Sequence, residues 1–268
     1  MTAAPSSPLR ADDDGRGVAT SYERFLSAVV RAQLAAWLPE SRSRLLDISR
    51  QDRTRGSIDL SSRMARCGHD VIRAIDVSGV GAAVPPPGLV VAGADPMPAV
   101  SYVAGDVRAL DWFRSESVDG LVAEGSALSS ALAIEATLEQ ATRLVRPGGR
   151  LLLSVDSLHF GLARLAEQHR WPELANAGQS DVVLVPTVDG GYSRCFGPDE
   201  LREVATGAGF DVEWVRARTL IPPDVISYAV THDANVLGDL IASELHLSQQ
   251  REDEPLGMYL ALSATRRR

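Results

Sequence analysis

Between residues 18 and 38, apolar residues recur at three- and four-residue steps, which predicts an amphipathic helix. The apolar positions of this helix are Phe25, Leu26, Val29, Val30, Leu34 and Trp37. Pro39 ends the pattern. Short apolar runs bounded by turn residues then predict strands at 45–49 and 70–76, with a helix at 57–68 between them that stops at Gly68. This part of the chain therefore reads as a strand–helix–strand unit.

The rest of the chain continues the alternation of strands and helices. Strands are expected at 100–107, 117–125, 150–157, 211–219 and 257–267, with strand-like runs at 181–187 and 190–196. Helices are expected at 126–145, at 198–208 with Pro198 in the first turn and Gly209 past the end, and around 232–248. Residues 77–99 contain five prolines, so a helix there would be short or absent. The segment 158–198 has a mixed pattern.

This alternation implies an α/β fold with a mainly parallel sheet and helices on both faces. Sheets of this kind bind ligands outside the carboxyl ends of their strands, where the strand order reverses. The residues that end or follow the expected strands are therefore the candidates for a binding site. They are Asp47, Ser49, Asp76, Asp106 and Glu124.

Composition narrows the possible partners. The 268-residue chain has a formal net charge of −8, which argues against broad contact with nucleic acid or anionic lipid and favours a small-molecule partner. It contains no lysine, which excludes Schiff-base and P-loop chemistry. Cys67 and Cys195 are too isolated for a disulfide framework, as in a reducing compartment. The oligomeric state is open, and a homodimer is compatible with the sequence.

No apolar run approaches the length needed to cross a membrane, and the polar, acidic start lacks the features of a signal peptide. Residues 1–17 are expected to be a disordered leader, followed by a single domain over 18–268. The expected location is the cytoplasm.

Four segments carry a resemblance to the class I S-adenosylmethionine-dependent methyltransferases. They are RAIDVS, AGDVRAL, TRLVRPGGRLLLSVDS and FGPDELREVATGAGFDVEWVRA. The resemblance covers residues 18–268 and implies a Rossmann-like sheet of seven strands, mostly parallel, with one antiparallel strand among the last two. It also implies S-adenosylmethionine as the cofactor, no metal, and a lid or substrate insertion near 158–198.

The resemblance implies roles for the strand-end acids. Asp76 would accept hydrogen bonds from the ribose hydroxyls, and Asp106 would meet the adenine amine, with the Val107 amide near the ring. Each acid could instead simply cap a turn. Glu124 would face the aminoacyl part of the cofactor or the substrate, or it would lie opposite the dipole of the helix expected at 126–145.

The first loop departs most from the family pattern, D-x-G-x-G-x-G. Asp47 is present, but Ser49, Gln51 and Arg53 occupy the glycine positions, where glycine permits close approach to the cofactor. A rerouted loop could compensate if Arg50 paired with the methionine carboxylate of the cofactor. The arginines could equally point into water. We expect the segment to line the site along a different path, with weak cofactor affinity.

Methyl transfer requires little from the protein beyond alignment and, for a hydroxyl acceptor, a base. His159, just after a strand, is the candidate base, although such a histidine is often an ordinary surface residue. Tyr22, Trp171 and Tyr192 are candidates for substrate contact, with core packing as the alternative for the last two. Two functions remain: methyl transfer to a small molecule, or a methyltransferase-fold protein that has lost the cofactor and serves in regulation, scaffolding or other chemistry.

Overall fold

A computed structural model describes residues 20–50, 59–76, 100–107, 110–130, 134–177, 182–187, 190–252, 254 and 256–268, with the backbone alone for Asp76. The expected leader at 1–17 and the proline-rich segment 77–99 lie outside these residues. Within them, no helix is both long and apolar enough to cross a membrane.

The strands occur where the apolar runs predicted them. In the described part of the chain they are β1 (Arg44–Asp47), β2 (Asp70–Asp76), β3 (Val100–Gly105), β4 (Val118–Ala123), β5 (Val145–Ser157), β6 (Val183–Pro186), β7 (Tyr192–Phe196), β8 (Phe210–Arg218) and β9 (Tyr259–Arg266).

In the described part of the chain, helices precede or connect these strands. They are α1 (Ser21–Trp37), α2 (Leu60–Arg66), α3 (Ile134–Leu144), α4 (Leu158–Glu167), α5 (Trp171–Asn176), α6 (Pro198–Gly207), α7 (Pro223–His232) and α8 (Leu237–Gln250), with a short 3₁₀ turn at Ala234–Val236. Thr20 caps α1 and forms a capping box with Glu23, which fixes where this helix begins.

Seven strands form the expected sheet, in the order β3-β2-β1-β4-β5-β9-β8. Strands β1 to β5 pair in parallel. Strand β9 is antiparallel to both of its neighbours, β5 and β8. The predicted fold class, including a single antiparallel strand among the last two, is confirmed. The β6–β7 hairpin adds two strands beside the end of β5, so the described sheet has nine strands.

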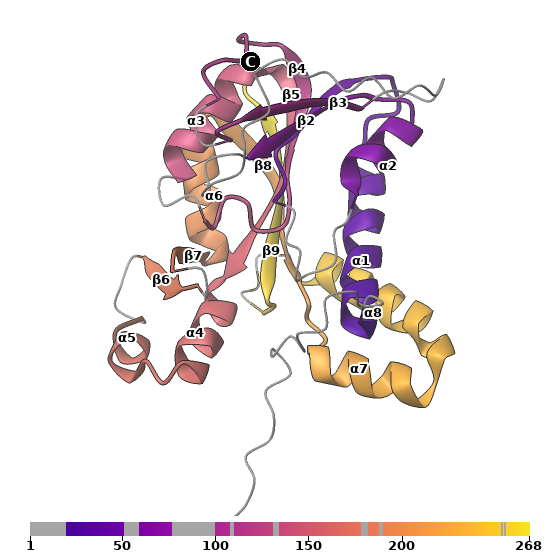
Figure 1. The fold of residues 1–268 in the computed structure, drawn as a ribbon, viewed down its shortest axis with the longest axis vertical. Coiled ribbons are helices and arrows are strands. Elements are labelled where there is room, and N and C mark those ends of the chain that lie inside the picture. Colours follow the sequence, from indigo (N-terminus) through magenta and orange to yellow (C-terminus); the bar gives the residue numbers. More distant parts are fainter. Residues whose placement is uncertain are drawn as a thin grey trace, which may run out of the picture.

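Helices cover both faces of the sheet. Leu34 and Trp37 of α1 and Met64 of α2 are in one apolar cluster with Leu45 of β1. The opposite cluster joins α3 and α6 to the sheet, and Figure 1 shows these helices on the other side from α1 and α2. Helices α7 and α8, inserted between β8 and β9, pack against α1. The burial pattern therefore follows the hydrophobic periodicity.

The helix expected at 126–145 is shorter than predicted, because α3 begins only at Ile134. Gly125 and Ser126 both have positive φ angles, 71° and 55°, a conformation that a right-handed helix cannot contain. At the other end, the RPGG sequence was expected to close the helix. It lies instead inside β5, which starts at Val145.

The expected helix around 232–248 is α8, which begins only at Leu237, and α7 before it was not predicted. Asp233 is extended between them, with φ −145° and ψ 106°, and its side chain caps the following turn by accepting from the Asn235 N–H. The mixed segment 158–198 contains α4, α5 and the β6–β7 hairpin. Its expected role as a lid stays a prediction.

Candidate functional site

The carboxyl ends of β3, β2, β1, β4 and β5 lie along one edge of the sheet, because these strands are parallel. Asp106 and Val107 directly follow β3 and are half-buried. Asp76 ends β2 in register with Gly105, the residue before Asp106. The side chain of Asp76 lies outside the description, so its predicted contact with ribose stays a prediction.

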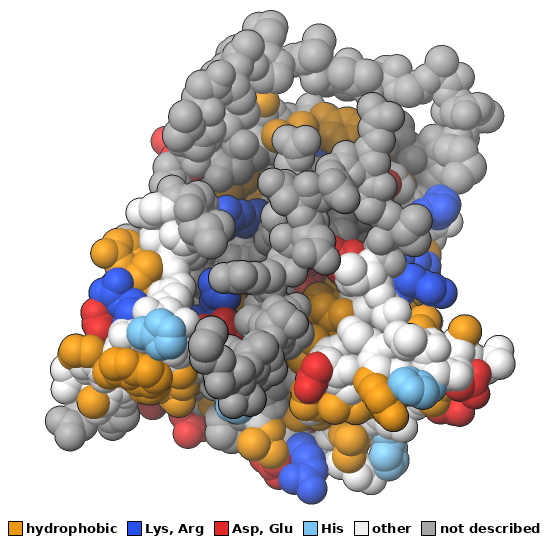
Figure 2. All heavy atoms as spheres, turned by 60° about the horizontal axis from the view of Figure 1, so that its bottom comes forward, with side chains coloured by type: hydrophobic (Ala, Val, Ile, Leu, Met, Phe, Trp, Pro, Cys, Tyr) orange, Lys and Arg blue, Asp and Glu red, His pale blue; other side chains and the backbone are white. Residues whose placement is uncertain are grey.

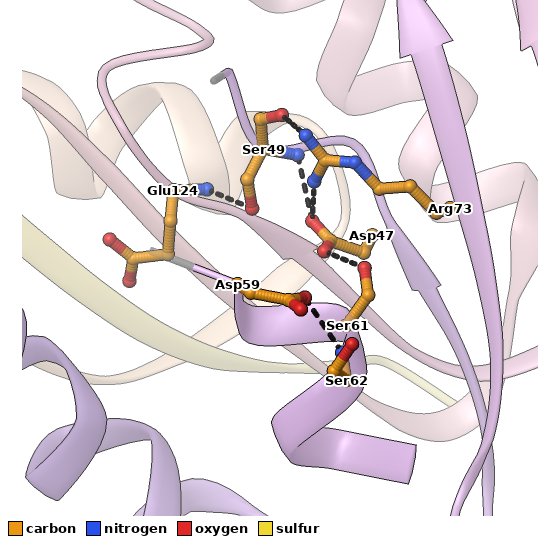
Figure 3. Close-up of polar contacts among 7 residues, drawn as sticks. All are labelled: Asp47, Ser49, Asp59, Ser61, Ser62, Arg73 and Glu124. Carbon is orange, nitrogen blue, oxygen red and sulfur yellow. Dashed lines mark hydrogen bonds and ion pairs between the residues drawn. The ribbon is translucent and has the colours of Figure 1, made fainter. Parts of the chain in front are cut away.

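Asp47, at the end of β1, is completely buried, and both its carboxylate oxygens are bonded within the protein (Figure 3). Its register partner Arg73 on β2 places Nη1 2.6 Å from Oδ1. The Ser49 N–H donates to the same oxygen at 2.9 Å, and the Ser61 hydroxyl of α2 donates to Oδ2. Arg73 also donates to the Ser49 carbonyl. One arginine therefore holds both the carboxylate and the chain two residues beyond it.

The chain after β1 stays alongside β4 instead of turning away at Asp47. The Ile48 N–H donates to the Val122 carbonyl, and the Arg50 N–H donates to the Glu124 carbonyl, both at 2.9 Å. The Ser49 hydroxyl accepts from the Glu124 N–H at 2.9 Å. The path through residue 50 is therefore extended, and residues 51–58, with Gln51 and Arg53, lie outside the description, so the expected departure from the family's glycine turn stays a prediction.

Close backbone approach does occur here, but the glycine that allows it is Gly125, after β4. A Cβ atom on Gly125 would lie 2.6 Å from the Arg50 carbonyl oxygen, and the residue has φ +71°. Only glycine meets both requirements without strain. The Arg50 residue itself is exposed.

Glu124 forms a bidentate ion pair with Arg218, at the end of β8. Arg218 Nη1 and Nη2 donate to the two carboxylate oxygens at 2.5 and 2.8 Å, and both side chains are almost fully buried. Arg218 Nε donates to Gln33 of α1. The alternative that Glu124 faces the dipole of a helix over 126–145 is wrong, because α3 begins ten residues after it.

The turn after Arg218 brings α1 and α8 to the same edge. Thr219 has φ +60°, and its hydroxyl lies 3.3 Å from the Tyr22 hydroxyl of α1. The buried carboxylate of Glu244 on α8 accepts from the Leu220 N–H at 3.0 Å and the Ile221 N–H at 3.1 Å. Burial raises the pKa of Glu244, while these backbone donors and Arg218 oppose the rise.

A fourth buried acid, Asp156, lies near the end of β5. Its carboxylate accepts from the hydroxyls of Ser126 and Ser193 at 2.6 and 2.5 Å, and its N–H donates to Ser129 Oγ at 2.7 Å. These bonds tie the turn after β4 and the strand β7 to β5. They also hold Ser126 in its positive-φ conformation, which is unusual for a residue other than glycine.

The remaining predicted residues lie apart from this group. His159 is exposed in the first turn of α4, Trp171 begins α5 with its ring 5.7 Å from that of His169, and Tyr192 is exposed at the start of β7. Within the described part of the chain, no hydrogen bond joins them to the residues after β1 and β4.

Figure 2 shows hydrophobic side chains gathered on both sides of this end of the molecule, over the α4–β7 segment and over α7 and α8. The exposed large ones include Trp171, Leu184, Tyr192, Val225 and Tyr228.

Three site residues were missed by sequence analysis, namely Arg73, Arg218 and Asp156. Arg73 interrupts the apolar strand VIRAID, and a charge in a buried strand requires a partner, so this signal was available. Asp156 gave the same signal in the apolar strand RLLLSVDS, but the sequence could not identify the partners of Asp156 or Arg218, since these come from distant segments. Among the described residues, no group of three or more histidine, cysteine or acidic side chains could hold a metal ion.

No family model matches the chain, and no curated protein matches it by sequence. Solved structures do match. An S-adenosylmethionine-dependent methyltransferase from Methanosarcina mazei is 16% identical with a TM-score of 0.53, covering 88% of this chain and 97% of that chain. One from Mesorhizobium loti is 16% identical with a TM-score of 0.50, covering 89% and 98%. This chain has the methyltransferase fold.

A further match to this methyltransferase fold has ligands. The 1,6-didemethyltoxoflavin-N1-methyltransferase of Burkholderia thailandensis, solved with 1,6-didemethyltoxoflavin and S-adenosylhomocysteine bound, is 18% identical with a TM-score of 0.50. The match covers 92% of this chain and 79% of that chain. The fold implied by the sequence resemblance is thus found independently in the three-dimensional comparison.

Proposed function

We propose that this protein transfers a methyl group from S-adenosylmethionine to a small-molecule acceptor. The observation that carries the proposal is the carboxyl edge of the sheet, where Asp106 follows β3 and the ordered segment Asp47–Arg50 lies against Glu124. The methyltransferase fold supports it, as does the Burkholderia enzyme, whose structure holds S-adenosylhomocysteine and a small acceptor.

The residues after β3 suit the nucleoside end of this cofactor. Asp106 offers a half-buried carboxylate for the adenine amine, with Val107 beside it. A Cβ on Gly105 would lie 2.5 Å from the ring of Trp112, so the indole packs directly on the end of β3. Trp112 is 43% exposed and stacks on Phe113 with ring centroids 4.2 Å apart, so it would add apolar contact at this end of the site. Asp76, one strand further in, would bind the ribose hydroxyls.

The aminoacyl end would lie against the segment after β1. Arg50 is exposed at its end and would pair with the cofactor carboxylate, a charge-assisted bond in place of glycine-loop contacts. Asp47 and Ser49 would contribute through the path they give the chain. Glu124, held by Arg218, would form the boundary between the cofactor and acceptor sides.

The cofactor, when bound, supplies an activated methyl group, so the protein's task is to align the acceptor and to take up a proton where the acceptor is a hydroxyl. The exposed His159 imidazole is the group we assign to that proton. The α4–β7 segment, with Trp171 and Tyr192, and the Tyr22 end of α1 would enclose an apolar acceptor between them.

The test is a calorimetric titration of the full chain with S-adenosylhomocysteine. We expect saturable binding, with a dissociation constant of about tens of micromolar or weaker because the glycine loop is altered. Asp106→Ala should weaken binding at least tenfold, whereas Asp239→Ala, an exposed aspartate on α8, should leave it unchanged. No binding at millimolar ligand would refute the proposal and favour a protein that has kept the fold without the cofactor.

A further inference from the structure

We propose that Arg73 is the positioning residue of the cofactor site, and that its ion pair with Asp47 replaces the glycine turn in fixing the path of residues 47–50. This inference rests on the proposed function. It assigns Arg73 and Asp47 to the shape of the site and leaves contact with the ligand to their neighbours.

The contacts of Arg73 all point inward. One guanidinium nitrogen lies 2.6 Å from the Asp47 carboxylate and another donates to the Ser49 carbonyl. The arginine side chain is 8% exposed and the aspartate side chain 1%. Because the two residues are register partners on β2 and β1, the arginine spans both the end of a strand and the first residues beyond it.

Asp47 connects Arg73 to the backbone of residue 49 and to α2. Its Oδ1 receives both Arg73 and the Ser49 N–H, while Oδ2 receives the Ser61 hydroxyl from α2. Residue 49 is thus held through its N–H by the aspartate and through its carbonyl by the arginine. The N–H and the carbonyl of Ser49 are therefore both hydrogen-bonded within the protein. Figure 3 shows the Asp47 and Arg73 side chains that form these bonds.

The opposite side of the segment is held by β4 and the turn after it. The Ser49 hydroxyl and the Arg50 N–H bond to the backbone of Glu124, and Gly125 allows the Arg50 carbonyl to approach. Residues 47–50 are therefore held by the Arg73–Asp47 ion pair on one side and by the close contact with Gly125 on the other. Loss of the charged pair should release one side only, which makes its contribution measurable.

Hydrogen exchange of the ligand-free protein tests the device without any cofactor. Arg73→Met should speed exchange of the Ile48, Ser49 and Arg50 amides at least tenfold, while the amides of β4 keep their protection. The matched control is Arg42→Met, which breaks the exposed ion pair with Asp70 at the other end of β2 and should change none of these rates. Unchanged exchange at 48–50 in Arg73→Met would overturn the positioning role.

Affinity for S-adenosylhomocysteine provides the second readout. Arg73→Met should weaken binding at least tenfold, and Arg73→Lys, which keeps the charge but can bond only one of the two partners well, should recover part of the loss. Where Arg73→Met does not fold, Ser61→Ala and the paired Asp47→Asn/Arg73→Met variant, which leaves no uncompensated buried charge, make the same test. Each should loosen residues 48–50 and weaken binding.

The outcomes separate the two proposals. If the parent binds and all these variants bind within twofold of it, Arg73 has no positioning role and the proposed function stands. If the parent itself fails to bind at millimolar ligand, the proposed function is wrong, and the cofactor role of Arg73 falls with it even where exchange at 48–50 responds as expected.

Discussion

Arg218 Nη1 and Nη2 donate to the two oxygens of the Glu124 carboxylate at 2.5 and 2.8 Å, and neither side chain is more than 4% exposed. Ninety-four positions separate the two residues. The pair joins the end of β8 to the end of β4, and the bond from Arg218 to Gln33 extends the connection to α1. The Arg218–Glu124 ion pair thus stabilises the position of the candidate site relative to β8 and α1.

Removing one partner of this pair should be costly. Arg218→Met leaves the Glu124 carboxylate buried without its cation, and we expect a loss of about 3–5 kcal/mol in the free energy of unfolding. Urea denaturation of parent and variant measures it. Arg42→Met, which breaks the exposed Arg42–Asp70 pair, should cost less than about 1 kcal/mol. Equal losses in the two variants would contradict the role given to burial.

Gly125 should tolerate no side chain, because it combines a positive φ with close contact to the Arg50 carbonyl. Gly148 is the matched control, since it has φ +77° but a Cβ atom added there would meet no other atom within 4 Å. Gly148→Ala should lose about 1–2 kcal/mol from the backbone conformation alone. Gly125→Ala should lose clearly more by urea denaturation, and S-adenosylhomocysteine affinity should fall with it. Equal losses would show that the close contact relaxes freely.

The periodicity of the sequence was sufficient for the sheet and for the strand-end positions, because buried parallel strands require continuous apolar runs. It could not show how the strand-end side chains pair. The partners of Asp47 and Glu124 depend on strand register and on segments far apart in the chain. Arg73, inside an apolar strand, was the one partner that the sequence marked.

The helix errors have local causes. The apolar pattern at 126–145 resembles one long helix, but the turn at Gly125 and Ser126 and the bonds to Asp156 keep residues 126–130 out of the helix. The helix expected to begin near residue 232 begins at Leu237, because Asp233 is extended and ends the preceding helix α7, which was not predicted.

Binding should depend on salt if Arg50 holds the cofactor carboxylate. An exposed ion pair weakens as ionic strength rises, whereas backbone hydrogen bonds change little. We expect titrations of S-adenosylmethionine at low and high salt to differ several-fold for the parent, and the difference to shrink in Arg50→Ala. An affinity that changes with neither ionic strength nor the Arg50→Ala substitution would show that Arg50 is a solvated surface residue.

His69 should make stability fall as the pH falls from about 7.5 through 6.5 and below. The residue is 2% exposed, and burial lowers its pKa, with Asp70 opposing the shift. The unfolded chain therefore takes up a proton near pH 6.5 before the folded chain does, and stability falls as the pH falls through that range. His69→Gln should flatten this part of the melting-temperature profile, and the exposed His246→Gln should not. Parallel profiles for parent and His69→Gln would exclude His69 as the source.

Binding of S-adenosylmethionine at the carboxyl edge of the sheet is the central claim. Hydrogen exchange of the full chain with and without saturating S-adenosylhomocysteine tests it most directly, because it reports both whether and where the ligand binds. We predict added protection at residues 45–50, 103–107 and 122–126, with no change in the amides at the amino end of β2. Protection confined to other parts of the chain, or none at millimolar ligand, would contradict the claim.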